Sequence, residues 1–181
     1  MNELLKNVRP TDYLLAALMT VAGAFLMWEN ISLSDDAGLA HPTSTTSWWM
    51  LPTFVLVTLP ILWRRRNILA VVAVTTVVTA GHVLAFGWIT RCGVLLPLSF
   101  ALAYGVARFA GSLRNQMIGL AGILVLQLVT LVQDSSTGGL PHGLELAIPL
   151  AAVFYGIGLI VQNRATRRHA VTTSARQAER V

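Results

Sequence analysis

LELAIPLAAVFYGIGLIV, residues 144–161, runs directly into QNRATRRHAVTTSARQAERV, residues 162–181. The first part is an apolar block whose one charge, Glu145, stands at its start, whereas the second part carries five arginines. An apolar block of about 18 residues can cross, or nearly cross, a hydrocarbon core about 30 Å thick as a helix. We therefore predict a membrane helix that leaves the bilayer and continues as a basic, helix-prone tail.

The remainder of the chain has the composition of a membrane protein. Of its 181 residues, 55% are hydrophobic and 12% are charged, about half the charged share of soluble proteins. The first apolar block ends in Trp28-Glu29-Asn30 rather than a small-residue cleavage site, so we expect a retained helix and not a signal peptide. We predict an all-α integral membrane bundle of six transmembrane helices, arranged as three hairpins. The predicted spans are about 13–31, 48–63, 68–89, 94–107, 116–132 and 144–161, within a membrane domain 1–162 followed by a tail 163–181.

The basic residues predict the orientation of this bundle. With the amino terminus inside, every lysine and arginine except Arg91 falls on an inner segment, as the positive-inside rule requires. We therefore expect both termini to be cytoplasmic, in the cell membrane. The net charge of +5 is explained by residues that flank apolar blocks, so no nucleic-acid partner is expected. Arg64, Arg65 and Arg66 are interpreted as a topology determinant that also meets anionic lipid head groups.

Four ionisable residues near the outer helix ends are candidate sensing residues. His82 lies within the third span, where ionisable groups are costly and often functional. The favoured alternative is a neutral imidazole that is bonded to a neighbouring helix or lies close to the interface, because no second membrane histidine completes a haem or metal pair. Glu29, Arg91 and Glu145 could line an outward-facing pocket in which Arg91 pairs with either carboxylate. Boundary charges that cap helices and face water are the favoured alternative.

No catalytic, cofactor or metal site is predicted. The single cysteine, Cys92, excludes an internal disulfide, and the chain contains no phosphate-binding loop, nucleophile elbow or zinc-protease motif. The outer loops do contain potential metal ligands, but these lie on separate loops without ligand spacing. Those residues are Asp35, Asp36, His41, Asp134 and His142.

The tail carries a weak periodic pattern. Val171, Ser174, Ala178 and Val181 follow 3-4-3 spacing, which is the spacing of a helical seam between two chains. A solvated basic tail that contacts lipid head groups is an equally good interpretation. With the seam, we expect a homodimer paired through the last span and the tail.

Five short segments carry a family resemblance: RPTDYLLA (9–16), WRRRNILAVV (63–72), PLSFALAYGVAR (97–108), GLIVQNRATRR (158–168) and RQAER (176–180). They resemble the amino-terminal membrane domain of sensor histidine kinases from actinobacterial-type two-component systems. The resemblance covers nearly the whole chain and rests on hydrophobic pattern together with these motifs. It implies that the last span leads through a cytoplasmic helix to a histidine-bearing segment and an ATP-binding domain, which would begin where this sequence stops.

Three hypotheses for function follow. The first is a membrane input module that passes a signal through its last helix to a cytoplasmic histidine kinase or response-regulator system. The second is a small permease or cofactor-binding membrane protein that uses His82 and the outer carboxylates. The third is a membrane anchor or scaffold whose basic tail recruits a soluble partner.

Overall fold

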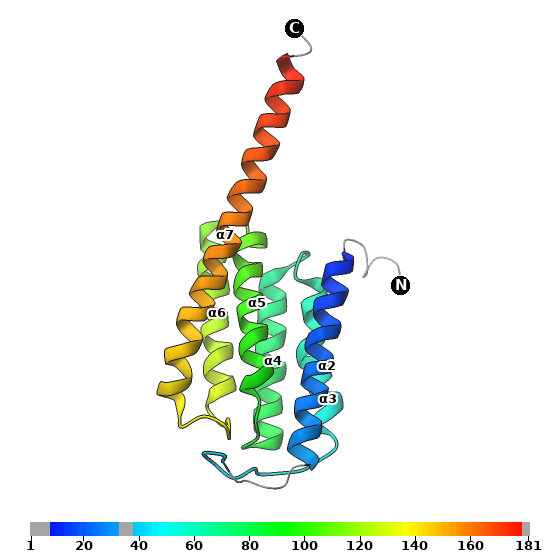
Figure 1. The fold of residues 1–181 in the computed structure, drawn as a ribbon, viewed down its shortest axis with the longest axis vertical. Helices are drawn as coiled ribbons and strands as arrows, with labels where there is room; N and C mark the ends of the chain where they lie inside the picture. Colours follow the sequence, from blue (N-terminus) through cyan, green and yellow to red (C-terminus); the bar gives the residue numbers. More distant parts are fainter. Residues whose placement is uncertain (1–7, 33–37, 179–181) are drawn as a thin grey trace.

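The fold is a bundle of helices from which one long helix protrudes (Figure 1). The computed structural model describes residues 8–32 and 38–178, with side chains described as far as residue 167. Within these residues the chain is all-α, and the only pairing of β type is one isolated bridge between Ile89 and Asp134. The elements are α2 (Pro10–Ser32), α3 (Met50–Thr58) continued by the 3-10 helix η1 (Leu59–Trp63), α4 (Ile68–Phe86), α5 (Cys92–Phe109), α6 (Leu113–Leu131) and α7 (Leu140–Ala178).

Five of these helices are long and apolar enough to cross a membrane: α2, α4, α5, α6 and residues 140–167 of α7. The shorter apolar pair α3 and η1, residues 50–63, spans roughly 24 Å at about 1.5 Å per α-helical and 2.0 Å per 3-10 residue. Large apolar side chains cover the outside of the bundle, and Leu84, for example, is 87% exposed. Such surface is costly in water and natural against lipid. The chain is a multi-pass membrane protein.

Local signals explain several helix ends. The side chain of Asn67 caps α4 by accepting the Ala70 N–H at 3.1 Å, and Ser112 caps α6 by accepting the Asn115 N–H at 3.3 Å. Gly87 follows α4 with a φ of +61°, a conformation that glycine adopts at little cost. Helix α4 ends at Phe86, whereas the predicted third span ends at residue 89. Helix α5 extends beyond the predicted fourth span, 94–107, at both ends. Helix α6 begins at Leu113, before the predicted start at residue 116.

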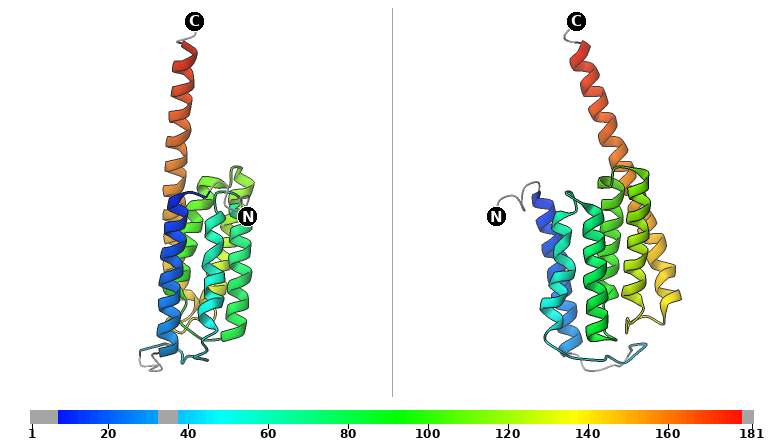
Figure 2. Two further views of the ribbon diagram at one scale, coloured as in Figure 1. Left: turned by 90° about the vertical axis from the view of Figure 1, so that its right-hand side faces the viewer. Right: turned by 180° about the vertical axis from the view of Figure 1, so that it is seen from behind.

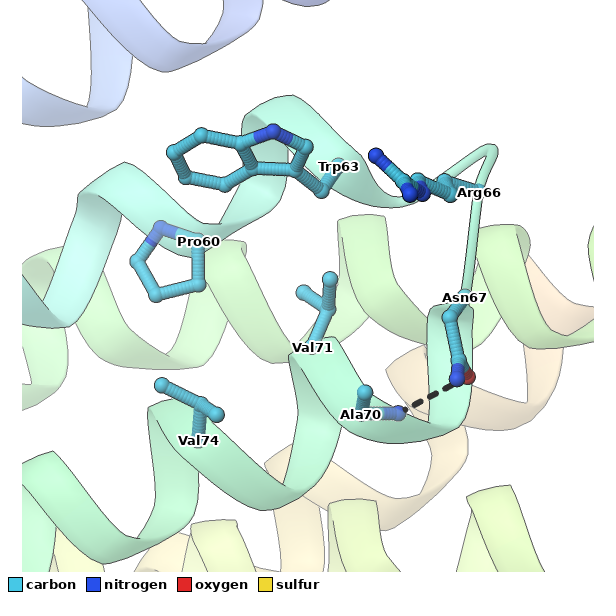
Figure 3. A pocket seen from close by; sticks show the side chains of 7 residues that line it. All are labelled: Pro60, Trp63, Arg66, Asn67, Ala70, Val71 and Val74. Atoms are coloured by element: carbon cyan, nitrogen blue, oxygen red, sulfur yellow. Dashed lines mark hydrogen bonds between the residues drawn. The ribbon is translucent and has the colours of Figure 1, made fainter. Parts of the chain in front are cut away.

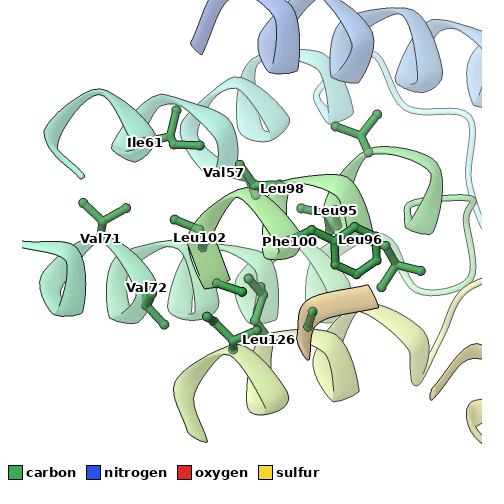
Figure 4. Packing of buried hydrophobic residues seen from close by; sticks show 14 of the residues in the cluster. Val57, Ile61, Val71, Val72, Leu95, Leu96, Leu98, Phe100, Leu102 and Leu126 are labelled. Carbon is green, nitrogen blue, oxygen red and sulfur yellow. The ribbon is translucent and has the colours of Figure 1, made fainter. Parts of the chain in front are cut away.

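Helix α5 lies at the centre of the bundle and supplies more of the buried core than any other described helix (Figure 4). Leu95, Leu98 and Leu102 are fully buried there, together with Leu126 from α6 and Val57 from α3. The predicted arrangement of three sequential hairpins is wrong beyond the first pair. Helices α2 and α3 do pack together, but α4 packs chiefly on α6, and α5 packs chiefly on α7.

Helices α5 and α7 approach most closely at Gly158. A Cβ built there would lie 2.8 Å from the Tyr104 carbonyl oxygen and 2.7 Å from the Ala107 Cβ. These distances are too short for any real side chain, so only glycine fits without moving a backbone. The absence of a side chain lets α7 lie against α5 where α7 leaves the bundle.

Helix α7 is a single helix of 39 residues, about 58 Å long at 1.5 Å per residue. It begins at Leu140 rather than at residue 144, and it crosses the predicted boundary at residue 162 without a break. Its last part extends beyond the rest of the bundle (Figures 1 and 2). Val171, Ser174 and Ala178 belong to this extension, and Val181 lies outside the described residues.

The two ends of the bundle differ. The start of α2, the turn 64–67, the turn 110–112 and the protruding part of α7 lie at one end (Figure 2). The described part of the loop between α2 and α3, the turn 87–91 and the loop 132–139 lie at the other. We call these the basic end and the loop end.

Candidate functional site

The most unusual residue at the loop end is a fully buried arginine. Arg91 is 0% exposed, although it stands in the turn between α4 and α5. Its guanidinium donates through Nε to His82 Nδ1 at 3.2 Å, through Nη1 to the Gln133 carbonyl at 2.8 Å, and through Nη2 to the Gly87 carbonyl at 2.5 Å. Arg91 therefore joins the ends of α4 and α6 at the start of α5.

Asp134 holds the same junction from the loop that precedes α7. Its Oδ2 accepts the backbone N–H groups of Arg91 at 2.7 Å and Cys92 at 2.6 Å, and its Oδ1 accepts the Ser136 N–H at 3.0 Å. The first N–H groups of a helix lack partners within that helix, so Asp134 acts as an N-terminal cap supplied from another segment. Burial lowers the pKa of Arg91 to about 10, and the Asp134 charge opposes this change. The guanidinium remains charged at neutral pH.

His82 of α4 is the buried side-chain partner of Arg91. It is 3% exposed, and its ring packs against Phe54 and Phe86 at centroid distances of 5.4 and 4.7 Å. Because Nδ1 accepts from Arg91, the proton of a neutral ring is on Nε2. Nε2 forms no hydrogen bond of ordinary geometry with the described residues, although the Met50 backbone interacts with the ring.

Two further buried oxygens at this end lack hydrogen bonds among the described residues: Thr79 Oγ1, which is one helical turn from His82, and Ser135 Oγ. Unsatisfied buried polar atoms are uncommon in folded proteins, and each represents a bond that another arrangement could form. We call His82, Arg91, Asp134, Thr79 and Ser135 the outer polar cluster. Its polar groups are not all satisfied in the arrangement that the structure shows.

The three loops at this end are also bonded to one another. The Ser135 N–H donates to the Ile89 carbonyl at 3.3 Å, and the Ser135 carbonyl accepts the Ala40 N–H at 2.9 Å. Asn30, near the end of α2, exchanges two hydrogen bonds with the Thr90 backbone at 2.9 and 3.0 Å. A displacement of any one loop would therefore strain or break hydrogen bonds at the ends of several helices.

The predicted pocket of Glu29, Arg91 and Glu145 does not form. Arg91 bonds to His82 and to backbone carbonyls, and neither glutamate is among its partners in the described residues. Glu29 is half-buried and Glu145 is exposed. The alternative that these boundary charges all face water is wrong for Arg91. His82 does bond to a group outside its own helix, but that group is the arginine in the adjacent turn.

The other candidate ligands do not converge either. Among the residues with a described position, no three histidine, cysteine, aspartate or glutamate side chains could hold a metal ion together. The carboxylate of Asp134 is occupied by backbone N–H groups, and the ring of His41 packs on Trp88 at 4.1 Å. Asp35 and Asp36 lie outside the described residues.

At the basic end, the arginine triplet has a partner that the sequence did not reveal. Asp12 is 0% exposed and accepts Arg64 at 2.8 Å and Arg65 at 2.7 Å. These ion pairs join the first turn of α2 to the turn before α4. Arg65 also lies over the Phe109 ring, 5.1 Å from its centroid, and Arg108 lies 5.8 Å from it. Arg66 is exposed.

A third set of polar contacts connects α7 to the bundle between its two ends. Gln127 of α6 is 1% exposed and donates to Ser99 Oγ of α5 at 3.1 Å and to the Ala147 carbonyl of α7 at 3.3 Å. Nearer the basic end, the Tyr155 hydroxyl donates to Gln116 Oε1 at 2.6 Å. Helix α7 is therefore held by polar bonds at two levels as well as by its close approach to α5.

Comparisons with protein families, with curated proteins and with solved structures find no match for this chain. Its class is defined by the fold alone, as a multi-pass membrane protein, all-helical in its described residues, with a buried polar cluster at its loop end.

Proposed function

We propose that this protein is a membrane input module, which detects a change at its loop end and passes it through α7 to a cytoplasmic partner. In this proposal all six apolar segments cross the cell membrane, the shorter segment 50–63 included. Both termini are then cytoplasmic. The distribution of arginine and lysine supports this orientation, because Arg91 is the one basic residue that it leaves outside, and Arg91 is buried.

The observation that carries the proposal is the continuity of α7. One helix runs from Leu140, six residues after Asp134, through the bundle to Ala178. A continuous helix transmits a shift, tilt or rotation along its length, and displacements of 1–2 Å are typical of helices that signal in this way. The outer polar cluster therefore lies at one end of a rigid rod whose other end is outside the bundle.

The outer polar cluster has the properties of a switch. A charged arginine and a histidine are buried together, and two hydroxyl oxygens at this end, those of Thr79 and Ser135, lack hydrogen bonds among the described residues. An alternative packing could satisfy some of these atoms while breaking the contacts of Arg91, so two arrangements could lie close in free energy. A stimulus acting on the outer loops or on the surrounding bilayer would favour one of them.

The protruding part of α7 would pair with the same segment of a second copy of the chain. The 3-4 spacing of the tail extends back through Arg167, Arg164, Ile160, Ile157 and Val153. Ile160, Ile157 and Val153 are 54%, 45% and 55% exposed, so one apolar stripe of the membrane part continues in register into the tail. The two arginines interrupt the stripe near the membrane surface, where lipid head groups can neutralise them. This register supports a homodimer paired along α7.

The cytoplasmic partner would be a histidine kinase or response-regulator system. The resemblance of residues 158–168 and 176–180 to the exit helix of sensor kinases supports this class of partner. The kinase core would belong to a continuation of this chain or to another protein.

Disulfide crosslinking of single cysteines in native membranes tests the pairing. Cys92 is first replaced by serine, and cysteines are then placed one at a time at Val171, Ser174 and Ala178. Thr173, on the other side of the same helix turn, serves as the matched control. We expect the three seam positions to crosslink faster than Thr173. If all four positions crosslink equally, or none does, the dimer seam is wrong.

A further inference from the structure

A slot on the outside of the bundle lies between η1 and the first two turns of α4, at the basic end (Figure 3). Its volume is about 340 Å³, within the range of about 300–1,000 Å³ that ligand sites occupy. The residues that line it are Pro60, Trp63, Arg66, Asn67, Ala70, Val71 and Val74.

Local sequence explains why this space is open. Pro60 at the start of η1 cannot donate a backbone hydrogen bond, and the chain continues there as a 3-10 helix, which is thinner than an α-helix. On the opposite wall, α4 presents the small side chain of Ala70 beside Val71 and Val74. The turn 64–67 lies at one end of the slot, and Val74 lies toward the other (Figure 3).

The slot has a polar mouth and an apolar body. Arg66 and Asn67 lie at the mouth, whereas Pro60 and Val74 lie at the other end, with the Trp63 ring beside Pro60 (Figure 3). From Asn67 to Val74 the helix rises about 10 Å, about a third of the hydrocarbon thickness. Tryptophan is typical of the boundary between head groups and hydrocarbon. Arg64 and Arg65 bind the buried Asp12, and Arg66 is exposed beside the slot.

We propose that this slot binds one anionic glycerophospholipid of the leaflet at the basic end. The Arg66 guanidinium contacts the phosphate, and one acyl chain lies between Pro60 and Val74, beside the Trp63 ring. Charge complementarity decides the class of lipid, because an exposed arginine favours an anionic over a zwitterionic head group. The inference rests on the bundle crossing a bilayer, and it does not depend on the signalling function.

Native mass spectrometry of the detergent-purified protein tests this site, with dioleoyl phosphatidylglycerol and dioleoyl phosphatidylcholine as the added lipids. Arg66→Gln should weaken phosphatidylglycerol binding at least about tenfold, as expected for a lost hydrogen bond to a charged group. It should weaken phosphatidylcholine binding less, because the choline of that head group offsets the phosphate charge. Val74→Phe fills the apolar body and should weaken the binding of both lipids. The folded state of each variant is checked by circular dichroism.

Two matched variants serve as controls. Arg114→Gln removes another exposed arginine at the basic end, and Val125→Phe enlarges a valine on α6 that is 48% exposed, as Val74 is. Both should bind the two lipids nearly as the unaltered protein does. The proposal is overturned if Arg66→Gln has no more effect than Arg114→Gln, or if Val74→Phe has no more effect than Val125→Phe.

Discussion

Replacing Asp134 by asparagine should destabilise the protein by roughly 2–4 kcal/mol. The substitution keeps the size of the side chain but removes its charge. Two hydrogen bonds from the backbone N–H groups of Arg91 and Cys92 then lose their charged acceptor. In addition, the fully buried guanidinium of Arg91 loses its compensating charge. An NH₂ group in the place of Oδ1 cannot accept the Ser136 N–H. Each of these changes acts in the same direction.

Reversible unfolding in mixed detergent micelles, with SDS as denaturant and circular dichroism as the signal, measures this change. Glu145→Gln is the matched control, because it removes an exposed carboxylate at the same end of the bundle and should leave the unfolding midpoint unchanged. If Asp134→Asn unfolds at the same SDS fraction as Glu145→Gln, then Asp134 does not hold the outer polar cluster together, and the reasoning fails.

Three other substitutions separate the contacts that matter most from those that matter least, all measured by the same unfolding assay. Asp12→Asn weakens two ion pairs to arginines at a fully buried carboxylate and should lower the free energy of unfolding by about 3 kcal/mol. A loss no larger than that of Glu145→Gln would show that these ion pairs do not hold α2 to the turn before α4. Gly158→Val would force a side chain against the α5 backbone and should destabilise strongly, whereas Gly156→Val meets open space and should not; equal effects would show that α5 and α7 do not pack closely. Gln127→Leu removes two hydrogen bonds and should cost only about 1.2 kcal/mol, at about 0.6 kcal/mol for each bond between membrane helices; a loss several times larger would mean that these bonds hold α7 in place.

Much of the fold could be predicted from local signals. Apolar blocks of sufficient length mark α2, α4, α5 and α6. Asn67 and Ser112 are recognisable as caps because asparagine or serine directly before an apolar run is a helix start signal. In the structure their side chains accept N–H groups three residues on. The basic tail was expected to be helical, and the chain is helical to Ala178. The second apolar segment was expected to be short, and it is the one element below the length of the others.

The candidate site could be predicted only in its residue types. His82 and Arg91 stood out because ionisable groups near a membrane core are rare, but their partners are not local. Asp134 caps a helix that begins 42 residues earlier, and Asp12 pairs with arginines more than 50 residues away. Such pairings depend on which helices are neighbours. Hydropathy marks a segment as buried in the membrane without specifying its neighbours, so the arrangement of α4 on α6 and α5 on α7 could not be anticipated.

We propose above all that the outer polar cluster is coupled to the protruding part of α7. Crosslinking rates of single cysteines at Val171, Ser174 and Ala178, compared between Asp134→Asn and Glu145→Gln in the Cys92→Ser background, test it most directly. The account predicts that Asp134→Asn changes the relative rates at the three positions, as a shifted or rotated helix requires, and that Glu145→Gln does not. Identical relative rates in both variants, with Asp134→Asn still folded in the membrane, would contradict the coupling and favour a membrane anchor.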